Sequence, residues 1–217
     1  MGVTLDCIDA DTREAAVEAG VRAVRAGQLV VLPTDTLYGI GADAFDSAAI
    51  SSLLAAKGRG RDMPVPVLVG SWDTVDGLVG HVDQRLRDLV EAFWPGGLTI
   101  VVEHARSLSW DLGDSRGTVA LRMPLHPVAL DLLRAVGPMG VSSANRSGQA
   151  PAQTAGEARD QLGDLVSVYL DAGPVARAGS GGVASTIVDV TTELPKVLRL
   201  GAVTLDDLRR VLPDITA

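Results

Sequence analysis

Short apolar runs of strand length alternate with segments of helical periodicity along this chain, and this alternation restricts its fold more than any other feature. Residues 29–33 read LVVLP, and residues 46–57 then carry apolar side chains at helical spacing. Such alternation predicts an α/β fold. Further strands are expected at 65–69, 98–103, 118–122 and 140–142, and three more cluster late in the chain, at 167–171, 185–189 and 196–200. The late cluster favours a mixed sheet over a regular doubly wound one.

Capping signals predict where several helices begin. Asp11 with Glu14, and Thr154 with Glu157, have the spacing of a capping box. Asp46 precedes the second helix, and Pro127 suits a first helical turn. Further helices are expected around residues 86–93 and 208–212. We expect the chain to form a single domain over residues 1–217, since this length suits one compact core.

Charge and cysteine content exclude several classes of protein. The formal net charge of −8 disfavours binding of long nucleic acids through the overall field of the protein. The single Cys7 cannot form an internal disulfide, which predicts a reducing compartment. The N-terminal sequence lacks the pattern of a secretory signal, and no segment reaches membrane-spanning length. The expected location is therefore the cytoplasm, without contact to a membrane.

The most informative local segment is KGRGR, which gives Lys57, Arg59 and Arg61 within five residues of an acidic chain. Arginine presents a planar fork to phosphate oxygens, lysine a compact charge, and the glycines let main-chain N–H groups approach a ligand. A polyphosphate site is one interpretation. The alternative is a solvated helix end whose cations complement the helix dipole. The segment does not match the glycine-rich nucleotide-binding motifs.

Two other polar groupings allow both a functional and a structural interpretation. Residues 142–148, SSANRSG, suit ribose, base or phosphate, but the segment taken alone favours a hydrogen-bonded turn. Arg122 ends an apolar strand, where it suits either a surface salt bridge or the binding of a carboxylate. Ser185 and Arg199 taken singly are more often structural than functional. His81, His104 and His126 lack metal-ligand spacing, and no catalytic triad is apparent.

Seven sequence blocks in the same order resemble the YrdC-type threonylcarbamoyl-AMP synthase family. The blocks are PTDTLYGIGADAF at 33–45, KGRGRDMPVPVLV at 57–69, WPGGLT at 94–99, LRMPLHPVA at 121–129, SSANRSG at 142–148, STIVD at 185–189 and LRLGAV at 198–203. The resemblance covers most of the chain. It implies a single YrdC-like α/β domain, with a twisted mixed sheet and flanking helices around a basic cavity.

The resemblance also implies an activity. An L-threonylcarbamoyladenylate synthase, a nucleotidyltransferase, converts L-threonine, bicarbonate and ATP into threonylcarbamoyl-AMP and pyrophosphate for the threonylcarbamoyladenosine modification of tRNA. Mg²⁺ would arrive with ATP, since no carboxylate cluster suggests a protein metal site. Separate threonylcarbamoyl-transferase proteins would use the product, and contact with tRNA itself would be at most weak or transient. The chain is expected to lack the additional C-terminal domain of longer family members.

The resemblance assigns residues by motif. Lys57 and Arg59 are the catalytic candidates. ATP contacts are assigned to Lys57, Arg59, Thr118, Ser143, Asn145 and Arg199. Threonine contacts are assigned to Thr36, Arg122 and Ser185. Met63 and Leu68 stand where the family often has asparagine and histidine, and we expect backbone groups or water to replace those contacts.

Two alternative functions remain at this stage. One is a carbamoyl-adenylating module that consumes carbamoyl phosphate, which would normally need additional domains. The other is an RNA-binding module that uses the same basic cavity. Aromatic residues make up only 3% of the chain, so few side chains are available for stacking on bases.

Overall fold

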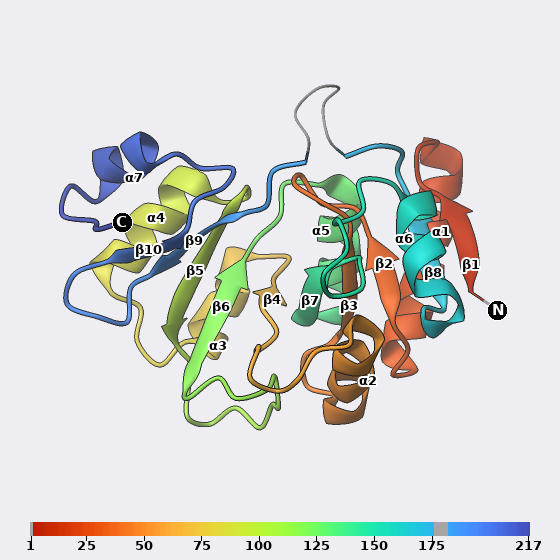
Figure 1. The fold of residues 1–217 in the computed structure, drawn as a ribbon, viewed down its shortest axis with the longest axis horizontal. Coiled ribbons are helices and arrows are strands. Elements are labelled where there is room, and N and C mark those ends of the chain that lie inside the picture. Colours follow the sequence, from red (N-terminus) through yellow and green to blue (C-terminus); the bar gives the residue numbers. More distant parts are fainter. Residues whose placement is uncertain (1, 176–181) are drawn as a thin grey trace.

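The computed structural model describes residues 2–175 and 182–217, and its strands there form one ten-stranded mixed sheet (Figure 1). The strands are β1 Val3–Asp6, β2 Val30–Leu32, β3 Gly39–Asp43, β4 Val67–Leu68, β5 Leu98–Glu103, β6 Thr118–Arg122, β7 Met139–Ser143, β8 Val168–Asp171, β9 Thr186–Asp189 and β10 Lys196–Arg199. Their order across the sheet is β1-β8-β2-β3-β7-β4-β6-β5-β9-β10. The predicted mixed sheet is confirmed, because the sheet contains both parallel and antiparallel strand pairs.

Helices flank this sheet. They are α1 Ala10–Arg25, α2 Ser47–Lys57, α3 Val75–Leu78, α4 Gln84–Phe93, α5 Pro127–Val136, α6 Ala155–Leu162 and α7 Leu205–Val211, with 3₁₀ helices at Trp72–Thr74 and Gly163–Leu165. Helices α1, α5 and α6 lie around the half of the sheet that contains β1, β8 and β2, whereas α4 and α7 lie beside β5, β9 and β10 (Figure 1). None of the helices described here is long and apolar enough to cross a membrane.

Most predicted helix starts are correct, and one is wrong. Asp46 caps α2 through its carboxylate, and Thr154 caps α6 by accepting from the Glu157 amide. Helix α1 is capped by Asp9, which accepts from the Asp11 amide, and not by Asp11. Asp9 precedes the first helical residue with extended backbone, as a capping residue must.

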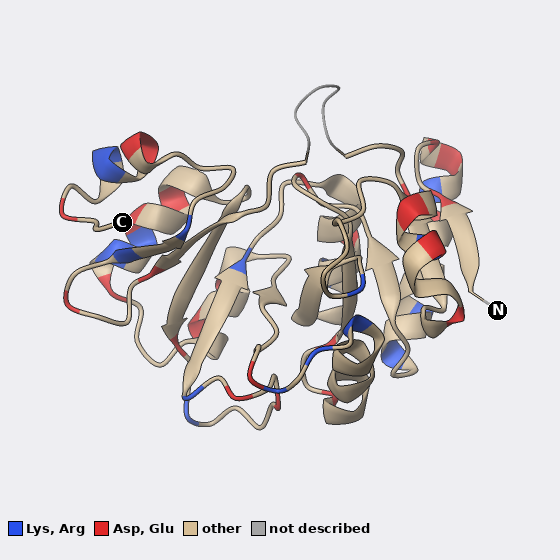
Figure 2. Ribbon diagram, viewed as in Figure 1, with Lys and Arg blue, Asp and Glu red and all other residues tan. Residues whose placement is uncertain are grey.

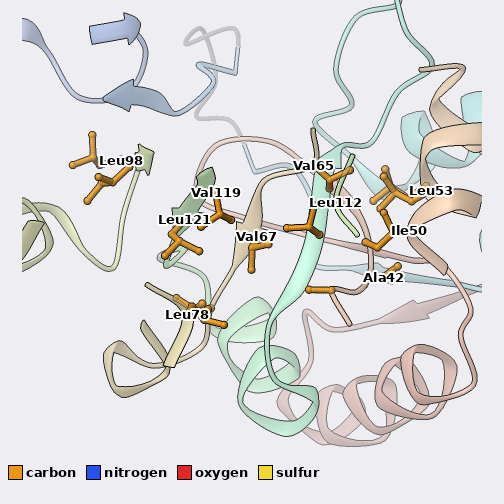
Figure 3. Packing of buried hydrophobic residues seen from close by; sticks show 14 of the residues in the cluster. Ala42, Ile50, Leu53, Val65, Val67, Leu78, Leu98, Leu112, Val119 and Leu121 are labelled. Carbon is orange, nitrogen blue, oxygen red and sulfur yellow. The ribbon is translucent and has the colours of Figure 1, made fainter. Parts of the chain in front are cut away.

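Two apolar clusters hold the layers together. The larger cluster packs α2, α4 and α6 against the sheet, with Val67, Leu112, Val119 and Leu121 near its centre (Figure 3). The second cluster packs α1 and α5 on the opposite side of β2 and β7, and it includes Leu68. The side chain of Leu68 is therefore part of the apolar core.

Strand β3 was not expected from the sequence, because it is glycine-rich and follows a polar loop. It pairs antiparallel with both β2 and β7. A Cβ atom at Gly39 would lie 2.6 Å from Cγ1 of Val141, and one at Gly41 would lie 2.9 Å from Cγ2 of the same residue. Glycine at these positions therefore leaves room for the side chain of Val141 against β3.

Candidate active site

Buried polar side chains identify the site. Eight polar or charged side chains are buried among the described residues: Thr34, Thr36, Lys57, Thr99, Arg122, Asn145, Ser185 and Thr186. Five of them are residues that the sequence motifs singled out. Buried polar groups cost free energy unless they are paired, so their concentration in the sequence blocks listed above marks a specialised region.

Arg122 is held by three hydrogen bonds at the end of β6. Its Nε donates to the Gly96 carbonyl over 2.9 Å, and its Nη1 donates to the hydroxyl of Thr36 over 2.9 Å. Its Nη2 donates to Oδ1 of Asp35 over 2.7 Å. Burial lowers the pKa of Arg122, while the Asp35 carboxylate raises it and the nearby Arg199 lowers it. Arg122 is therefore a buried, fixed guanidinium and not a surface salt-bridge partner.

The register of the sheet places Arg122 and Arg199 on one row. Val101 lies opposite Ala120, so continuing the register brings Thr99 opposite Arg122. Thr99 in turn pairs with Ile187, and Ile187 with Arg199. The row crosses β6, β5, β9 and β10, which separates the two arginine Cα atoms by roughly 14 Å. Residues opposite one another point to the same face, so both guanidinium groups serve one face of the sheet.

Hydroxyl groups fill the space beside this row. Thr99 donates to Oγ of Ser185 over 2.8 Å. Arg199 bonds the carbonyl of Ser185 through Nε and Nη2, at 3.1 and 2.7 Å, and reaches Oγ of Ser185 at 3.1 Å. The hydroxyls of Thr34 and Thr36 lie 3.1 Å apart. The structure thus joins the ATP-assigned Arg199 directly to the threonine-assigned Ser185.

Lys57 is buried inside the protein and is not exposed at a solvated helix end. Its side chain is almost fully buried, with 1% relative exposure, in the last turn of α2. Its ammonium group donates to the carbonyl of Ser143, to the carbonyl of Asn145 at 2.5 Å and to Oδ1 of Asn145 at 2.9 Å. Burial, followed by repulsion from Arg59, lowers the pKa of Lys57 from 10.5 to about 7. The interpretation of Lys57 as a solvated helix end is therefore wrong.

Arg59 and Arg61 point to different partners although they share one loop. Arg59 donates to the hydroxyls of Ser147 and Ser142, both at 3.2 Å. Arg61 forms a two-pronged pair with Asp111, at 3.0 and 2.6 Å, on the exposed surface. In Figure 2 basic residues mark the end of α2, the loop after it and the tip of β6. Arg59 faces the SSANRSG loop, and Arg61 ties its own loop to the segment before β6.

A main-chain contact joins the region around Lys57 to the region around Arg122. The amide of Ala144 donates to the carbonyl of Tyr38 over 2.8 Å, so the loop bound by Lys57 lies against the loop that carries Thr36.

Thr118 lies further away, at the other end of the Arg122 face of β6, roughly 13 Å along the strand. It borders a cavity of about 220 Å³ lined mainly by apolar side chains, including Leu198. A larger hollow of about 600 Å³ lies on α1 and contains none of the predicted site residues.

Comparison with known proteins gives the relationship of this chain to others. The Sua5/YciO/YrdC family model, described as "Telomere recombination", matches residues 22–201. The chain belongs to the Sua5/YciO/YrdC family.

Relatives in the Sua5/YciO/YrdC family span most of this chain. A Mycobacterium tuberculosis protein named "Putative threonylcarbamoyl-AMP synthase" is 59% identical over 212 residues, which cover 98% of this chain and 96% of that protein. The Bacillus subtilis threonylcarbamoyl-AMP synthase is 32% identical over 94% of this chain and 58% of its own length. The crystal structure of P. abyssi Sua5 complexed with L-threonine matches with a TM-score of 0.92 at 30% identity, over 99% of this chain and 62% of that one.

Single-residue reasoning missed several members of the site. Thr34, Asp35, Thr99 and Thr186 contribute hydrogen bonds here, and each lies inside a sequence block of the Sua5/YciO/YrdC family. The sequence signal that could have identified them is the presence of hydroxyl and carboxylate residues next to apolar strands.

Met63, at one of the two positions that differ from the common family pattern, is exposed. Within the described part of the chain, no group of three His, Cys, Asp or Glu residues could hold a metal ion.

Proposed function

We propose that this chain is an L-threonylcarbamoyladenylate synthase, a nucleotidyltransferase that joins L-threonine, bicarbonate and ATP into threonylcarbamoyl-AMP with release of pyrophosphate. The observation that carries the proposal is the buried Arg122, which lies among hydroxyl groups and on the same row as Arg199. A fixed guanidinium suits a carboxylate, and a second one nearby suits a phosphate. The names of the relatives above support the same activity.

In this proposal the threonine lies at Arg122. Its carboxylate pairs with the guanidinium, and the hydroxyls of Thr36 and Ser185 accept or donate hydrogen bonds at its polar groups. Both hydroxyls are buried, and Thr36 already bonds Arg122 at 2.9 Å. A ligand bound there would contact groups whose positions are set by the protein, which lowers the entropic cost of binding.

ATP lies towards Arg199 and the KGRGR loop. Arg59 and Arg199 neutralise phosphoryl charge, and Thr118, Ser143 and Asn145 supply polar contacts. Lys57 contributes its positive charge while its N–H groups hold the loop of Ser143 and Asn145. Mg²⁺ would arrive with the phosphates of ATP and would assist charge neutralisation there.

The chemistry needs little from the protein except positioning and charge neutralisation. The neutral amine of threonine reacts with bicarbonate to form a carbamate and water. A carbamate oxygen then attacks the α-phosphorus of ATP, and the bond to pyrophosphate breaks. Both nucleophiles come from the substrates, which is why fixed arginines and hydroxyls suffice.

The product would pass to separate threonylcarbamoyl-transferase proteins that modify tRNA, and we place this reaction in the cytoplasm. Contact with tRNA would be at most transient on a chain with a net charge of −8. The named relatives favour the synthase over an RNA-binding module or a carbamoyl phosphate-consuming module.

The test is to incubate the purified protein with MgATP, threonine and bicarbonate, and to follow pyrophosphate and the nucleotide products by mass spectrometry. Pyrophosphate should form only when threonine and bicarbonate are both present, together with a product of the mass of threonylcarbamoyl-AMP. Equal pyrophosphate release without threonine would contradict the proposal. Release that depends on carbamoyl phosphate would favour the alternative adenylating reaction.

A further inference from the structure

Asp35 joins Arg122 to the main chain that leads into α5. Its Oδ1 accepts from Nη2 of Arg122 at 2.7 Å and from the amide of Leu125 at 2.8 Å. The side chain of Asp35 is 18% exposed and that of Arg122 is 8% exposed. A carboxylate therefore lies inside the region that the proposed function gives to an anionic group of the substrate.

The hydrogen bonds of Arg122 determine which of its donors can reach a ligand. A guanidinium has five N–H groups. Nε is used by Gly96, one N–H of Nη1 by Thr36, and one N–H of Nη2 by Asp35. Within the described residues, one N–H on Nη1 and one on Nη2 are left over. The three anchors come from two loops, one that carries Gly96 and one that carries Asp35 and Thr36, and together they fix the plane of the guanidinium. Two N–H groups on neighbouring nitrogens of a fixed guanidinium suit one carboxylate.

Asp35 also changes the charge of the site. An arginine buried alone would attract any small anion, whereas an arginine paired with a carboxylate forms a nearly neutral unit. A simple carboxylate is attracted less strongly to such a nearly neutral pair than to an arginine alone. A zwitterionic α-amino acid carries an ammonium group next to its carboxylate, and that ammonium is attracted by Asp35. Arg199 adds a positive charge nearby, but its guanidinium is engaged with Ser185.

We propose that Asp35 is a positioning and specificity residue: it fixes the guanidinium of Arg122 and cancels its charge, so that the site prefers a zwitterionic α-amino acid to a simple carboxylate. This inference rests on the proposed function, because it takes the Arg122 pocket as the amino-acid site. It adds to that function a reason for choosing an amino acid over the corresponding hydroxy acid.

The test compares two ligands by calorimetric titration without ATP. One is L-threonine, and the other is 2,3-dihydroxybutanoate of matching configuration, in which a hydroxyl replaces the ammonium. Wild-type protein should bind threonine more tightly. Asp35→Asn keeps the size of the side chain and an acceptor for the Leu125 amide but removes the charge. It should shift the ratio of the two dissociation constants towards the hydroxy acid by about tenfold or more.

The matched control is Asp131→Asn, which removes the same charge from an exposed pair with Arg134 on α5. It should leave the ratio unchanged. A general loss of stability would weaken both ligands together, so the ratio separates a specific role of Asp35 from a structural one. An Asp35→Asn protein that folds and keeps the wild-type ratio overturns the inference.

If Asp35→Asn does not fold, Asp35→Glu provides the test, because it keeps the charge and changes only the length. Its ratio should stay within about threefold of wild type, even where both affinities fall. Loss of the preference for threonine in that variant overturns the inference. A wild-type protein that binds no threonine would overturn the proposed function itself, and this inference with it.

Discussion

The ammonium nitrogen of Lys57 lies 2.5 Å from the carbonyl oxygen of Asn145 and 2.9 Å from its side-chain oxygen. A third hydrogen bond reaches the carbonyl of Ser143. The three N–H donors of the ammonium are thus matched by three uncharged oxygens. Lys57 pins the SSANRSG loop to the end of α2, so its removal affects folding as well as any ligand.

Lys57→Ala should lower the free energy of unfolding by about 2 to 3 kcal/mol. The substitution leaves buried carbonyl groups of the loop without a donor and opens space in the protein. Urea denaturation monitored by circular dichroism measures the change. Arg59→Ala serves as the comparison, because Arg59 is only half-buried and should alter stability much less. Equal stabilities of wild type and Lys57→Ala would show that the buried hydrogen bonds do not hold the loop.

Arg59→Ala should reduce turnover by a factor that corresponds to about 2 to 4 kcal/mol of transition-state stabilisation, as loss of one preorganised electrostatic contact does. Steady-state release of pyrophosphate gives the value. Arg61→Ala is the matched control from the same loop, because its guanidinium is paired with Asp111 on the surface. A similar loss in both variants would mean that the loop acts through its general charge, and not through the position of Arg59.

Arg122→Lys should weaken threonine binding markedly while ATP affinity stays within about threefold, an energy difference under ~0.7 kcal/mol. Lysine keeps the charge but cannot span the Gly96 carbonyl, Thr36 and Asp35 with one planar group. Arg199→Ala should do the reverse. Calorimetric titration of each variant with each ligand distinguishes them. If Arg122→Lys lost ATP and kept threonine, the assignment of the two subsites would be wrong.

The lowered pKa of Lys57 predicts a pH dependence of stability. Its pKa is about 7 in the folded protein, against 10.5 for an ordinary lysine, so the unfolded chain binds more protons between these values. Stability should therefore rise with pH above about 7, by at most about 1.4 kcal/mol per pH unit from this group. Below pH 7 the group is protonated in both states, and the cost of burying its charge is fully present.

The measurement compares urea denaturation of wild type and Lys57→Met at several values between pH 7 and 8.5. The free energy of unfolding should rise with pH in wild type and should not rise in Lys57→Met. The upper limit avoids Cys7, because burial raises the pKa of that thiol from 9.0 to about 11 and makes stability fall as the unfolded thiol ionises. Parallel pH profiles for the two proteins would rule out Lys57 as the titrating group.

The sequence by itself determined the elements whose signals are local. The predicted strand at residues 98–103 and the one at 118–122 match β5 and β6, and Asp46 and Gly58 bound α2 as their residue types require. Helix caps, apolar periodicity and the order of the motif blocks depend on neighbouring residues, so they can be recognised in the sequence alone. The sequence does not predict β1, which is short and mostly exposed, or β3, which is glycine-rich.

Only the tertiary structure decided how the site residues are paired. Asp35 meets Arg122 across 87 positions of sequence, and Lys57 meets Asn145 across 88. The row from Arg122 to Arg199 depends on the pairing of four strands and on the register shift between Val197 and Arg199 in β10. Local sequence specifies a side chain and its backbone conformation, but burial and charge compensation depend on groups that the fold brings from elsewhere in the chain. For this reason the motifs identified Arg122 and Lys57, while their partners and protonation required the assembled sheet.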